Sequence, residues 1–354
     1  MSGPGYFPKS LQEVTAPWLT AVLAARYPGT VVDDVTTGTV IGGMATKARL
    51  FLHYNAAGAA HGLPPSLWVK TGWGAHSDAF ISMNATEALF FRDLAPRLPI
   101  NCPKSYAELL DPDSPNGLIL MEDLLLRRAT FGTQSRPLEP DMMQRVLALQ
   151  AGYHAAFWRS PELDGLPWLK RGGAIVESQV IDMFLGFWDT AEQQPRFAKV
   201  PAVLRDRALM RKALMQMQDN DLRDACCIVH GDSHQANMFF DPDGTPGYLD
   251  WATVMRNHWA FDVSYLVVGS QSVENRRAHE REQLSFYLDR LAANGVRAPG
   301  FDEAWLSYRQ HAMWMFLTAM CPTAMHPEDV CVFNTERACT AIVDLETVKS
   351  LRCA

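Results

Sequence analysis

The residues best suited to do chemistry in this chain lie in one short stretch, residues 230–251, with the sequence HGDSHQANMFFDPDGTPGYLDW. Asp232, Asn237 and Asp250 place carboxylate and amide oxygens within it. A hard cation such as Mg²⁺ takes a few such oxygens and keeps its other positions for phosphate and water. The three side chains therefore indicate a site for phosphoryl transfer, and the simpler interpretation is that they are ordinary turn and loop residues.

The sequence pattern predicts the elements that hold these residues. The apolar run 226–229 predicts a short buried strand, and residues 230–235 a loop at its end. Residues 238–240 and 248–249 predict two further strands, joined by the turn-forming sequence Asp-Pro-Asp-Gly. We therefore expect a hairpin directly after the loop.

The register of this hairpin decides which oxygens meet. If Asp243 and Gly244 are the two central turn residues, Asn237 lies opposite Asp250, with Cα atoms about 4.5 to 5.5 Å apart. The prolines of this segment also allow a loop longer by a residue or two, which would move the pairing without separating the oxygens. We therefore expect Asn237 and Asp250 to converge beside Asp232.

The first part of the chain changes from a helical to a strand pattern. Residues 10–27 predict a helix, with Ser10 and Glu13 spaced as a capping box. Strands are then predicted over residues 31–35, 36–41 and 47–54. Between the last two strands, Gly42 and Gly43 would let backbone amides approach an anion closely. This glycine pair suggests a cover for nucleotide phosphates, and an ordinary hairpin turn explains it equally well.

Lys70 ends the next predicted strand, SLWVK, where it is either a snorkelling edge residue or a functional cation. In the following helix, MNATEALFFRDLAPRL, Glu87 falls on the same apolar stripe as Met83 and Phe90. A carboxylate in that position needs a partner, because an unpaired buried charge is strongly destabilising. We therefore expect Glu87 to pair with Lys70; the competing interpretation is a capping box with Asn84 at the start of the helix.

A strand at residues 117–125, GLILMEDLL, meets an acidic bend, after which the chain is mainly helical. Such a connector is where a protein of two lobes could hinge, and its exposed backbone could hydrogen-bond a flat base. Helices are predicted over residues 139–158, 174–188, 204–221, 276–295, 302–320 and 334–351, and residues 259–265 open another helix.

Composition limits the class of protein. The 354 residues suffice for two lobes around a large core, and the net charge of −7 argues against non-specific nucleic-acid binding. Seven cysteines, an odd number without a CxxC pair, favour a reduced, cytoplasmic protein over a disulfide framework. We see neither a signal peptide nor an apolar run of the roughly 18 residues that a membrane span needs.

HGD followed by HQAN, then YLDW and FDVSYL, resembles the catalytic core of the aminoglycoside phosphotransferase and choline kinase superfamily of small-molecule kinases. The spacing and the upstream LILMEDL resemble its ecdysteroid-kinase-like branch. The resemblance implies an α+β, protein-kinase-like fold of two lobes. Residues 1–122 would form a small, β-rich nucleotide-binding lobe, and residues 123–354 a larger, mainly helical lobe for catalysis and substrate binding.

The resemblance also implies a role for each matching residue. Asp232 would be the catalytic carboxylate that positions an acceptor hydroxyl and accepts its proton. Asn237 and Asp250 would hold Mg²⁺ on the phosphates of ATP, and Lys70, fixed by Glu87, would contact the α and β phosphates.

Other implied contacts concern backbone groups. Those near Glu122 and Leu124 would meet adenine. The loop GTVIGGMAT departs from the GxGxxG of protein kinases, so Gly42, Gly43 and Thr46 are candidate phosphate contacts by position. His230 and Asp262 would support the catalytic loop.

Two other classes of function compete with a kinase. A metallohydrolase would use His230, Asp232 and His234, whose alternation could put three ligands on one side of an extended strand. It would leave Asn237 and Asp250 without a role. A nucleotide-binding pseudokinase would be favoured if a functional residue were missing.

The phosphate acceptor is expected to be a small molecule with a hydroxyl group. A Met-rich and aromatic segment, residues 308–320, is either core or one wall of a pocket for an apolar alcohol. The alternative is a polar acceptor of the aminoglycoside or choline type. His234 is either a substrate contact or a packed loop histidine. The protein could form a homodimer.

Overall fold

The computed structural model describes residues 6–74, 80–172 and 178–353. The first residues of the predicted helix 174–188 lie outside this part of the chain. Contacts divide the chain into two compact units, which we treat separately. The N-terminal unit comprises Met1–Arg97, Cys102–Ala129 and Asp250–Ala252, and the C-terminal unit comprises Leu98–Asn101, Thr130–Leu249 and Thr253–Ala354. The first is a small sheet-based unit and the second is larger and mainly helical, as predicted.

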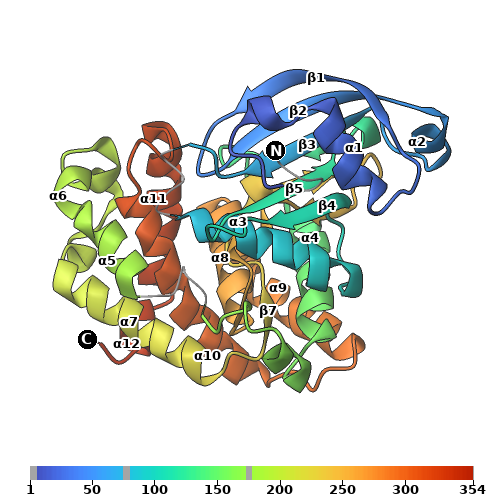
Figure 1. Ribbon diagram of the computed structural model, residues 1–354. Coiled ribbons are helices and arrows are strands. Elements are labelled where there is room, and N and C mark those ends of the chain that lie inside the picture. Colours follow the sequence, from blue (N-terminus) through green and yellow to red (C-terminus); the bar gives the residue numbers. More distant parts are fainter. Residues whose placement is uncertain (1–5, 75–79, 173–177, 354) are drawn as a thin grey trace. The chain divides into compact units, whose positions relative to one another are not determined.

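The N-terminal unit is built on an antiparallel five-stranded sheet of order β1-β2-β3-β5-β4 (Figure 1). Its strands are β1 Val32–Ile41, β2 Thr46–Tyr54, β3 Ser66–Thr71, β4 Ser105–Leu110 and β5 Gly117–Glu122. The two strands predicted over 31–35 and 36–41 form one strand, β1. The pairing with β2 is regular from Val35 to Thr36, where the break was predicted, and its register shifts on either side, between Val32 and Asp34 and between Thr37 and Val40.

Helices complete this unit: α1 Ala16–Ala24, α2 Ala56–Ala60 and α3 Ile81–Leu89, which continues as a π-helical turn, η3 Phe90–Leu94, and a 3₁₀ turn, η4 Ala95–Arg97. The cap of α1 is Thr15, whose hydroxyl accepts a hydrogen bond from the Trp18 amide at 3.4 Å. The capping box predicted at Ser10 and Glu13 is therefore misplaced. These two residues flank and end a short 3₁₀ turn, η1 Leu11–Glu13.

The core of the N-terminal unit lies under the sheet. Ala48, Leu50 and Leu52 alternate inward along β2, as their spacing predicts, while Phe51 between them is exposed. Gly117 begins strand β5, which lies between β3 and β4, and a Cβ there would lie 2.4 Å from the Asn84 carbonyl oxygen of α3. Glycine at this point lets α3 lie close against β5.

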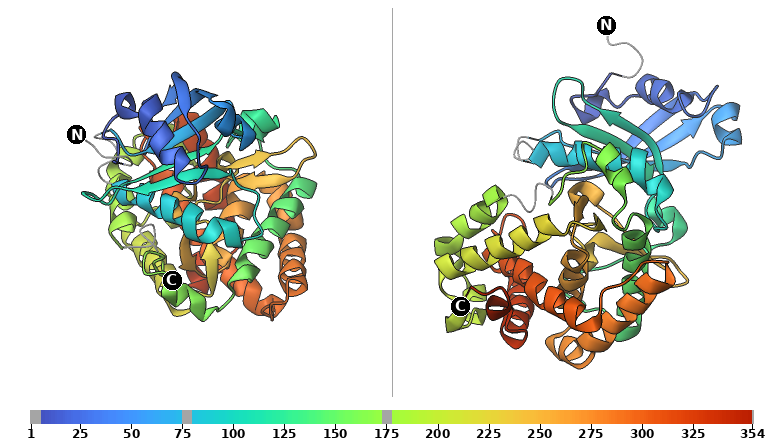
Figure 2. Two further views of the ribbon diagram at one scale, coloured as in Figure 1. Left: turned by 45° about the vertical axis from the view of Figure 1, so that its right-hand side comes forward. Right: turned by 90° about the horizontal axis from the view of Figure 1, so that it is seen from below.

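The C-terminal unit is mainly helical. Its α-helices are α4 Pro140–Ala156, α5 Ser178–Gly186, α6 Trp188–Ala191, α7 Arg207–Arg223, α8 Ala260–Ser270, α9 Val273–Ala293, α10 Phe301–His311, α11 Glu328–Asp344 and α12 Thr347–Ser350. Its short strands are β6 Thr130–Phe131, β7 Cys227–Val229, β8 Met238–Phe240, β9 Pro246–Tyr248 and β10 Met255–Asn257. Figure 2 shows α4, in green, beside α9, in orange.

The predicted hairpin is present as β8 and β9, but its register differs by one residue. Met238 pairs with Tyr248, and the Leu249 amide donates to the Asn237 carbonyl oxygen at 2.7 Å. Asn237 is therefore aligned with Leu249 and not with Asp250. The Asp241 amide donates to the Thr245 carbonyl oxygen at 3.0 Å. This bond closes a three-residue loop in place of the two-residue turn.

The predicted helix 302–320 is α10 followed by a 3₁₀ segment, η11 Ala312–Met320. Met313, Met315 and Phe316 in this segment are buried. This part of the chain is therefore core, the simpler of the two interpretations that the sequence allowed. Among the described residues, we find no helix with the length and apolarity that a membrane crossing requires.

Candidate active site

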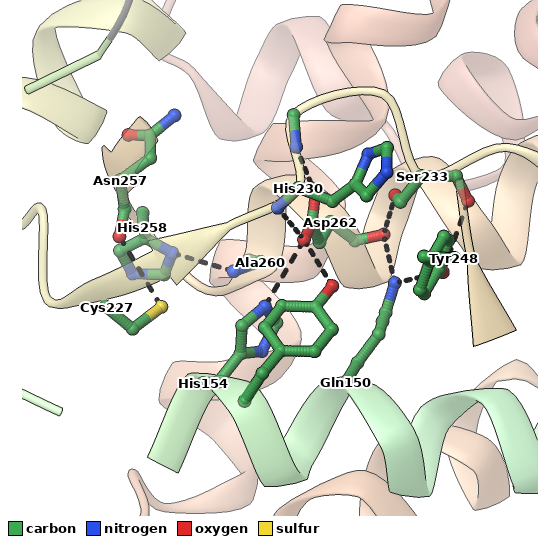
Figure 3. A network of polar contacts seen from close by, with 12 residues as sticks. Gln150, His154, Cys227, His230, Ser233, Tyr248, Asn257, His258, Ala260 and Asp262 are labelled. Carbon is green, nitrogen blue, oxygen red and sulfur yellow. Dashed lines mark hydrogen bonds and ion pairs between the residues drawn. The ribbon is translucent and has the colours of Figure 1, made fainter. Parts of the chain in front are cut away.

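The loop after β7 is held by one buried carboxylate, Asp262 of α8 (Figure 3). Its Oδ2 accepts from the His230 amide at 2.6 Å, and its Oδ1 accepts from the Gly231 amide at 3.0 Å. Two side chains of α4 also reach Oδ2: the Tyr153 hydroxyl at 2.6 Å and His154 Nε2 at 3.4 Å. Asp262 thereby ties the start of the loop to two helices, the supporting role that the family resemblance implied.

These bonds decide the charge of Asp262. Burial on its own would raise the pKa of this carboxyl group, but hydrogen bonds from His154 and Tyr153 and the charges of His154 and His230 leave the pKa lowered. Asp262 therefore stays ionised at neutral pH, in the form that accepts all of these donors.

Gly231 allows the loop to turn sharply. Its φ is +85°, and a Cβ there would lie 2.4 Å from the Thr253 carbonyl oxygen. The Thr253 hydroxyl donates to the His230 carbonyl oxygen at 2.8 Å. Glycine is required on both counts, because other residues disfavour this backbone region and the space is filled.

Asp232 lies at the centre of a second set of hydrogen bonds. Its Oδ1 accepts from the Tyr265 hydroxyl at 2.9 Å and its Oδ2 from Asn237 Nδ2 at 2.8 Å. His234 Nε2 is 3.4 Å from Oδ2. Burial would raise the pKa of Asp232, but His234, His230 and Tyr265 lower it to about 2. Asp232 is therefore a carboxylate in fixed orientation.

The ring nitrogens of the two loop histidines contact backbone groups, which does not suit a metal site with three protein ligands. His230 Nε2 is 2.7 Å from the Leu249 carbonyl oxygen, and its Nδ1 accepts from the Asp232 amide at 3.2 Å. His234 Nδ1 accepts from the Ala236 amide at 3.1 Å. Within the described residues, no group of three or more His, Cys, Asp or Glu side chains is arranged to hold a metal ion.

In the N-terminal unit, Lys70 and Glu87 form the predicted pair. Lys70 Nζ lies 2.6 Å from Glu87 Oε2 and 2.8 Å from Asp250 Oδ1. Burial would lower the pKa of Lys70, but the two carboxylates outweigh it and raise that pKa above its usual value. Lys70 is therefore a buried, permanently charged cation.

Glu87 lies within α3 and not at its start. The helix starts at Ile81, so Asn84 and Glu87 lie in its interior, and Asn84 Nδ2 donates back to the Ile81 carbonyl oxygen at 3.2 Å. The capping-box interpretation of Asn84 and Glu87 is therefore wrong. Gly117 brings the same helix close to β5 and so sets the distance from Glu87 to the sheet.

Lys47 is a site residue that the sequence analysis missed. It pairs directly with Lys70 across β2 and β3, and its Nζ is 3.4 Å from Asp250 Oδ2. Like charges opposite each other in a sheet repel, so the two lysines form a place for an anion, which the Asp250 carboxylate fills. A pocket is lined by Lys47, Lys70 and Asp250 together with Gly42 and Gly43.

Asp250 has an unusual backbone conformation, with φ at +57°. Asp tolerates this left-handed region better than most residues, and such residues often occur at functional sites. The next residue, Trp251, is fully buried and stacks on Phe90 at 4.3 Å between ring centroids. Trp251 thereby anchors Asp250 beside the helix that carries Glu87.

The remaining predicted contacts lie elsewhere in the N-terminal unit. Thr46 pairs with Thr71 at the start of β2. The Glu122 amide donates to the Lys104 carbonyl oxygen at 2.8 Å, and the Leu124 carbonyl oxygen accepts from the Ala129 amide at 3.2 Å. Both of these backbone groups already have partners within the unit.

Three solved structures that are similar to this chain are described as small-molecule kinases or phosphotransferases. An ethanolamine kinase from Plasmodium vivax has 9% sequence identity over 85% of this chain and 81% of its own, with a TM-score of 0.50. A choline kinase from Streptococcus pneumoniae has 14% identity over 87% and 94%, with a TM-score of 0.46. A macrolide 2'-phosphotransferase from Brachybacterium faecium has 16% identity over 92% and 98%, with a TM-score of 0.44. The first likeness supports the kinase-like fold.

Comparison of the sequence itself identifies the family. No curated protein matches the chain significantly. Residues 84–310, well over half of the chain, match the phosphotransferase enzyme family. The matched segment includes Glu87, the loop with Asp232, and Asp250 and Asp262. The chain therefore belongs to the phosphotransferase enzyme family.

Proposed function

We propose that this protein is a kinase that transfers the γ-phosphate of ATP, with Mg²⁺, to a hydroxyl group of a small molecule. The observation that carries the proposal is the state of Asp232, an ionised carboxylate fixed through both oxygens on a loop that Asp262 holds. Phosphoryl transfer depends on positioning and charge neutralisation more than on a reactive side chain. In this proposal residues 1–122 form the nucleotide-binding lobe and residues 123–354 the catalytic lobe.

Lys70 is the proposed contact of the α and β phosphates. It is a buried cation with a fixed partner, Glu87, and it lines a pocket together with Gly42 and Gly43. Backbone amides of the glycine pair and of Thr46 would cover the phosphates. Backbone groups near Glu122 and Leu124 would meet adenine.

Asn237 and Asp250 fit the proposed role of Mg²⁺ ligands. Asn237 directs its amide nitrogen to Asp232, so its amide oxygen is the atom that would face a cation. Asp250 offers carboxylate oxygens at a pocket. Bound Mg²⁺ would supply neutralisation of the phosphate charge.

The proposed role of Asp232 is to orient the acceptor hydroxyl and to take up its proton during transfer. A carboxylate with a pKa of about 2 is a weak base. Orientation of the hydroxyl is therefore its main contribution, and the proton moves late, as the oxygen–phosphorus bond forms.

For the acceptor we propose an apolar hydroxyl compound, as in the ecdysteroid-kinase-like branch that LILMEDL resembles. Support comes from Met325, an exposed side chain in the C-terminal unit. Burial and the charge of His234 lower the pKa of its neighbour His326, and the charge of Asp232 opposes this shift. The alternatives are a polar acceptor of the aminoglycoside or choline type, and a nucleotide-binding protein without turnover.

A screen with γ-labelled ATP and Mg²⁺ tests this proposal. The panel would contain apolar alcohols, aminoglycosides, choline and ethanolamine, and label transferred to each compound would be measured. We expect transfer to apolar alcohols. Transfer to aminoglycosides alone would refute the apolar acceptor, and nucleotide binding without transfer to any compound would favour the pseudokinase.

Replacement of Asp250 tests the metal assignment. We expect Asp250→Asn to abolish the rise in melting temperature that ATP causes in the presence of Mg²⁺, because the neutral amide is a weaker ligand for a hard cation. Asp34→Asn is the control, since it removes an exposed carboxylate from β1 in the same unit. An unchanged Mg²⁺-dependent stabilisation in Asp250→Asn would contradict the assignment.

A further inference from the structure

Helix α8 holds the catalytic loop at two points. Asp262 binds the backbone amides of His230 and Gly231. Tyr265, three residues further along the same helix, donates its hydroxyl to the side chain of Asp232. Residues three apart lie on one face of a helix. Asp262 therefore fixes the path of the loop, and Tyr265 fixes the carboxylate that the loop carries.

The two oxygens of Asp232 have different surroundings. Oδ2 accepts from Asn237 at 2.8 Å and lies 3.4 Å from His234 Nε2, whereas Oδ1 accepts from Tyr265 at 2.9 Å. The Ala236 amide donates to His234 Nδ1, so the proton of the neutral ring is on Nε2, facing Asp232. Each carboxylate oxygen has about two lone-pair sites. Oδ1 therefore keeps the greater capacity for one more donor.

Tyr265 is suited to act as a permanent donor. Burial and the charge of Asp232 raise the pKa of its hydroxyl well above the usual value. Its ring lies edge-on to that of His234, with centroids 6.0 Å apart. The phenol thus keeps its proton at neutral pH and donates it to Asp232.

We propose that Tyr265 is a positioning residue that orients Asp232 so that the free lone pair of Oδ1 receives the acceptor hydroxyl. The inference rests on the proposed function and adds to it the oxygen at which the acceptor binds. Without the Tyr265 hydroxyl, the carboxylate keeps its bonds on the Oδ2 side and can rotate about its Cβ–Cγ bond. Productive geometry then becomes less populated, although nucleotide binding is unaffected.

The test is Tyr265→Phe, assayed with labelled Mg·ATP and water as the phosphate acceptor, so that no acceptor has to be known. We expect kcat to fall by about tenfold or more, because small losses of alignment are costly in transfer reactions. The KM for Mg·ATP should change less than about twofold, since the variant alters orientation and not nucleotide contacts.

Tyr308→Phe is a matched control. Tyr308 donates its hydroxyl to Glu280 Oε2 at 2.9 Å, so this variant also removes one bond between a tyrosine and a carboxylate in the C-terminal unit. We expect Tyr308→Phe to lower the melting temperature and to keep the kcat of the unaltered protein. A loss of kcat in both variants would show a general effect on the fold and overturn the inference.

The double variant separates this inference from the proposed function. If Tyr265 acts through Asp232, adding Tyr265→Phe to Asp232→Asn will lower the residual turnover no further. Multiplicative losses in the double variant would overturn the inference, as would an unchanged kcat in Tyr265→Phe. Full turnover in Asp232→Asn alone would instead overturn the role of Asp232 on which the proposed function depends.

Discussion

Replacing Asp232 by Asn is expected to lower phosphate transfer about 10²- to 10⁴-fold, the usual contribution of a positioned acid or base. The variant loses the charge that orients the acceptor hydroxyl and the site that takes up its proton. It should still fold, because the new amide can accept from Asn237 with its oxygen and donate to the Tyr265 hydroxyl. Transfer of label from γ-labelled ATP and the affinity for Mg·ATP would be measured side by side.

The matched control for this variant is Asp243→Asn. Asp243 lies in the β8–β9 loop, where its Oδ1 accepts from the Thr245 amide at 2.9 Å. The variant Asp243→Asn makes the same change of charge in the same stretch of sequence, at a position other than Asp232. We expect turnover within about twofold of the unaltered protein. If Asp232→Asn also retained such activity, Asp232 would not be the catalytic carboxylate.

Local periodicity was sufficient to predict the pairing of Glu87 with Lys70 in the N-terminal unit. Glu87 repeats at helical spacing with Met83 and Phe90, and the cost of burying a lone carboxylate indicated a cation nearby. Its bond to Lys70, 2.6 Å long, confirms that argument. The same reasoning could not exclude the capping box, because Asn84 and Glu87 have that spacing whether the helix starts at Asn84 or, as it does, at Ile81.

Residues that depend on pairing between distant segments were not predictable. Lys47 becomes a site residue only when β2 and β3 align it with Lys70, and no local pattern fixes that register. Tyr265 looked like an ordinary helix residue, because its contact with Asp232 spans 33 positions. The hairpin register was missed by one residue because the sequence DPDG allowed loops of different length.

For Asp262, the structure identifies the atoms through which it holds the loop. The family resemblance implied that His230 and Asp262 support the loop, but not through which atoms. In the structure the Asp262 carboxylate accepts from two loop amides and contacts two side chains of α4. The backbone carbonyl oxygen of Asp262 accepts from the Ser233 hydroxyl at 3.0 Å (Figure 3). One residue thus connects the loop to both α8 and α4.

Replacing Asp262 by Asn is expected to lower the free energy of unfolding by about 3 to 5 kcal/mol, the usual loss when one partner of a buried charged network is removed. The amide has one acceptor oxygen in place of two, so at least one of the donors from His230, Gly231 and Tyr153 is left buried without its bond. Turnover should fall as well, because the loop that carries Asp232 loses its anchor. Denaturant unfolding and transfer of label would measure the two effects.

The pH dependence gives this prediction a sign. Because the pKa of Asp262 is lowered in the folded protein, its contribution is present in full above the usual carboxyl pKa of about 3.9 and is lost as the pH falls through the lowered value. The difference in free energy of unfolding between the unaltered protein and Asp262→Asn should therefore be constant near pH 7 and shrink below about pH 4.

Asp221→Asn is the control, since it alters a buried carboxylate that lies 2.5 Å from His311 Nε2. It should lower stability while turnover at low temperature persists, whereas equal loss of turnover in both variants would contradict a specific role of Asp262 in holding the loop.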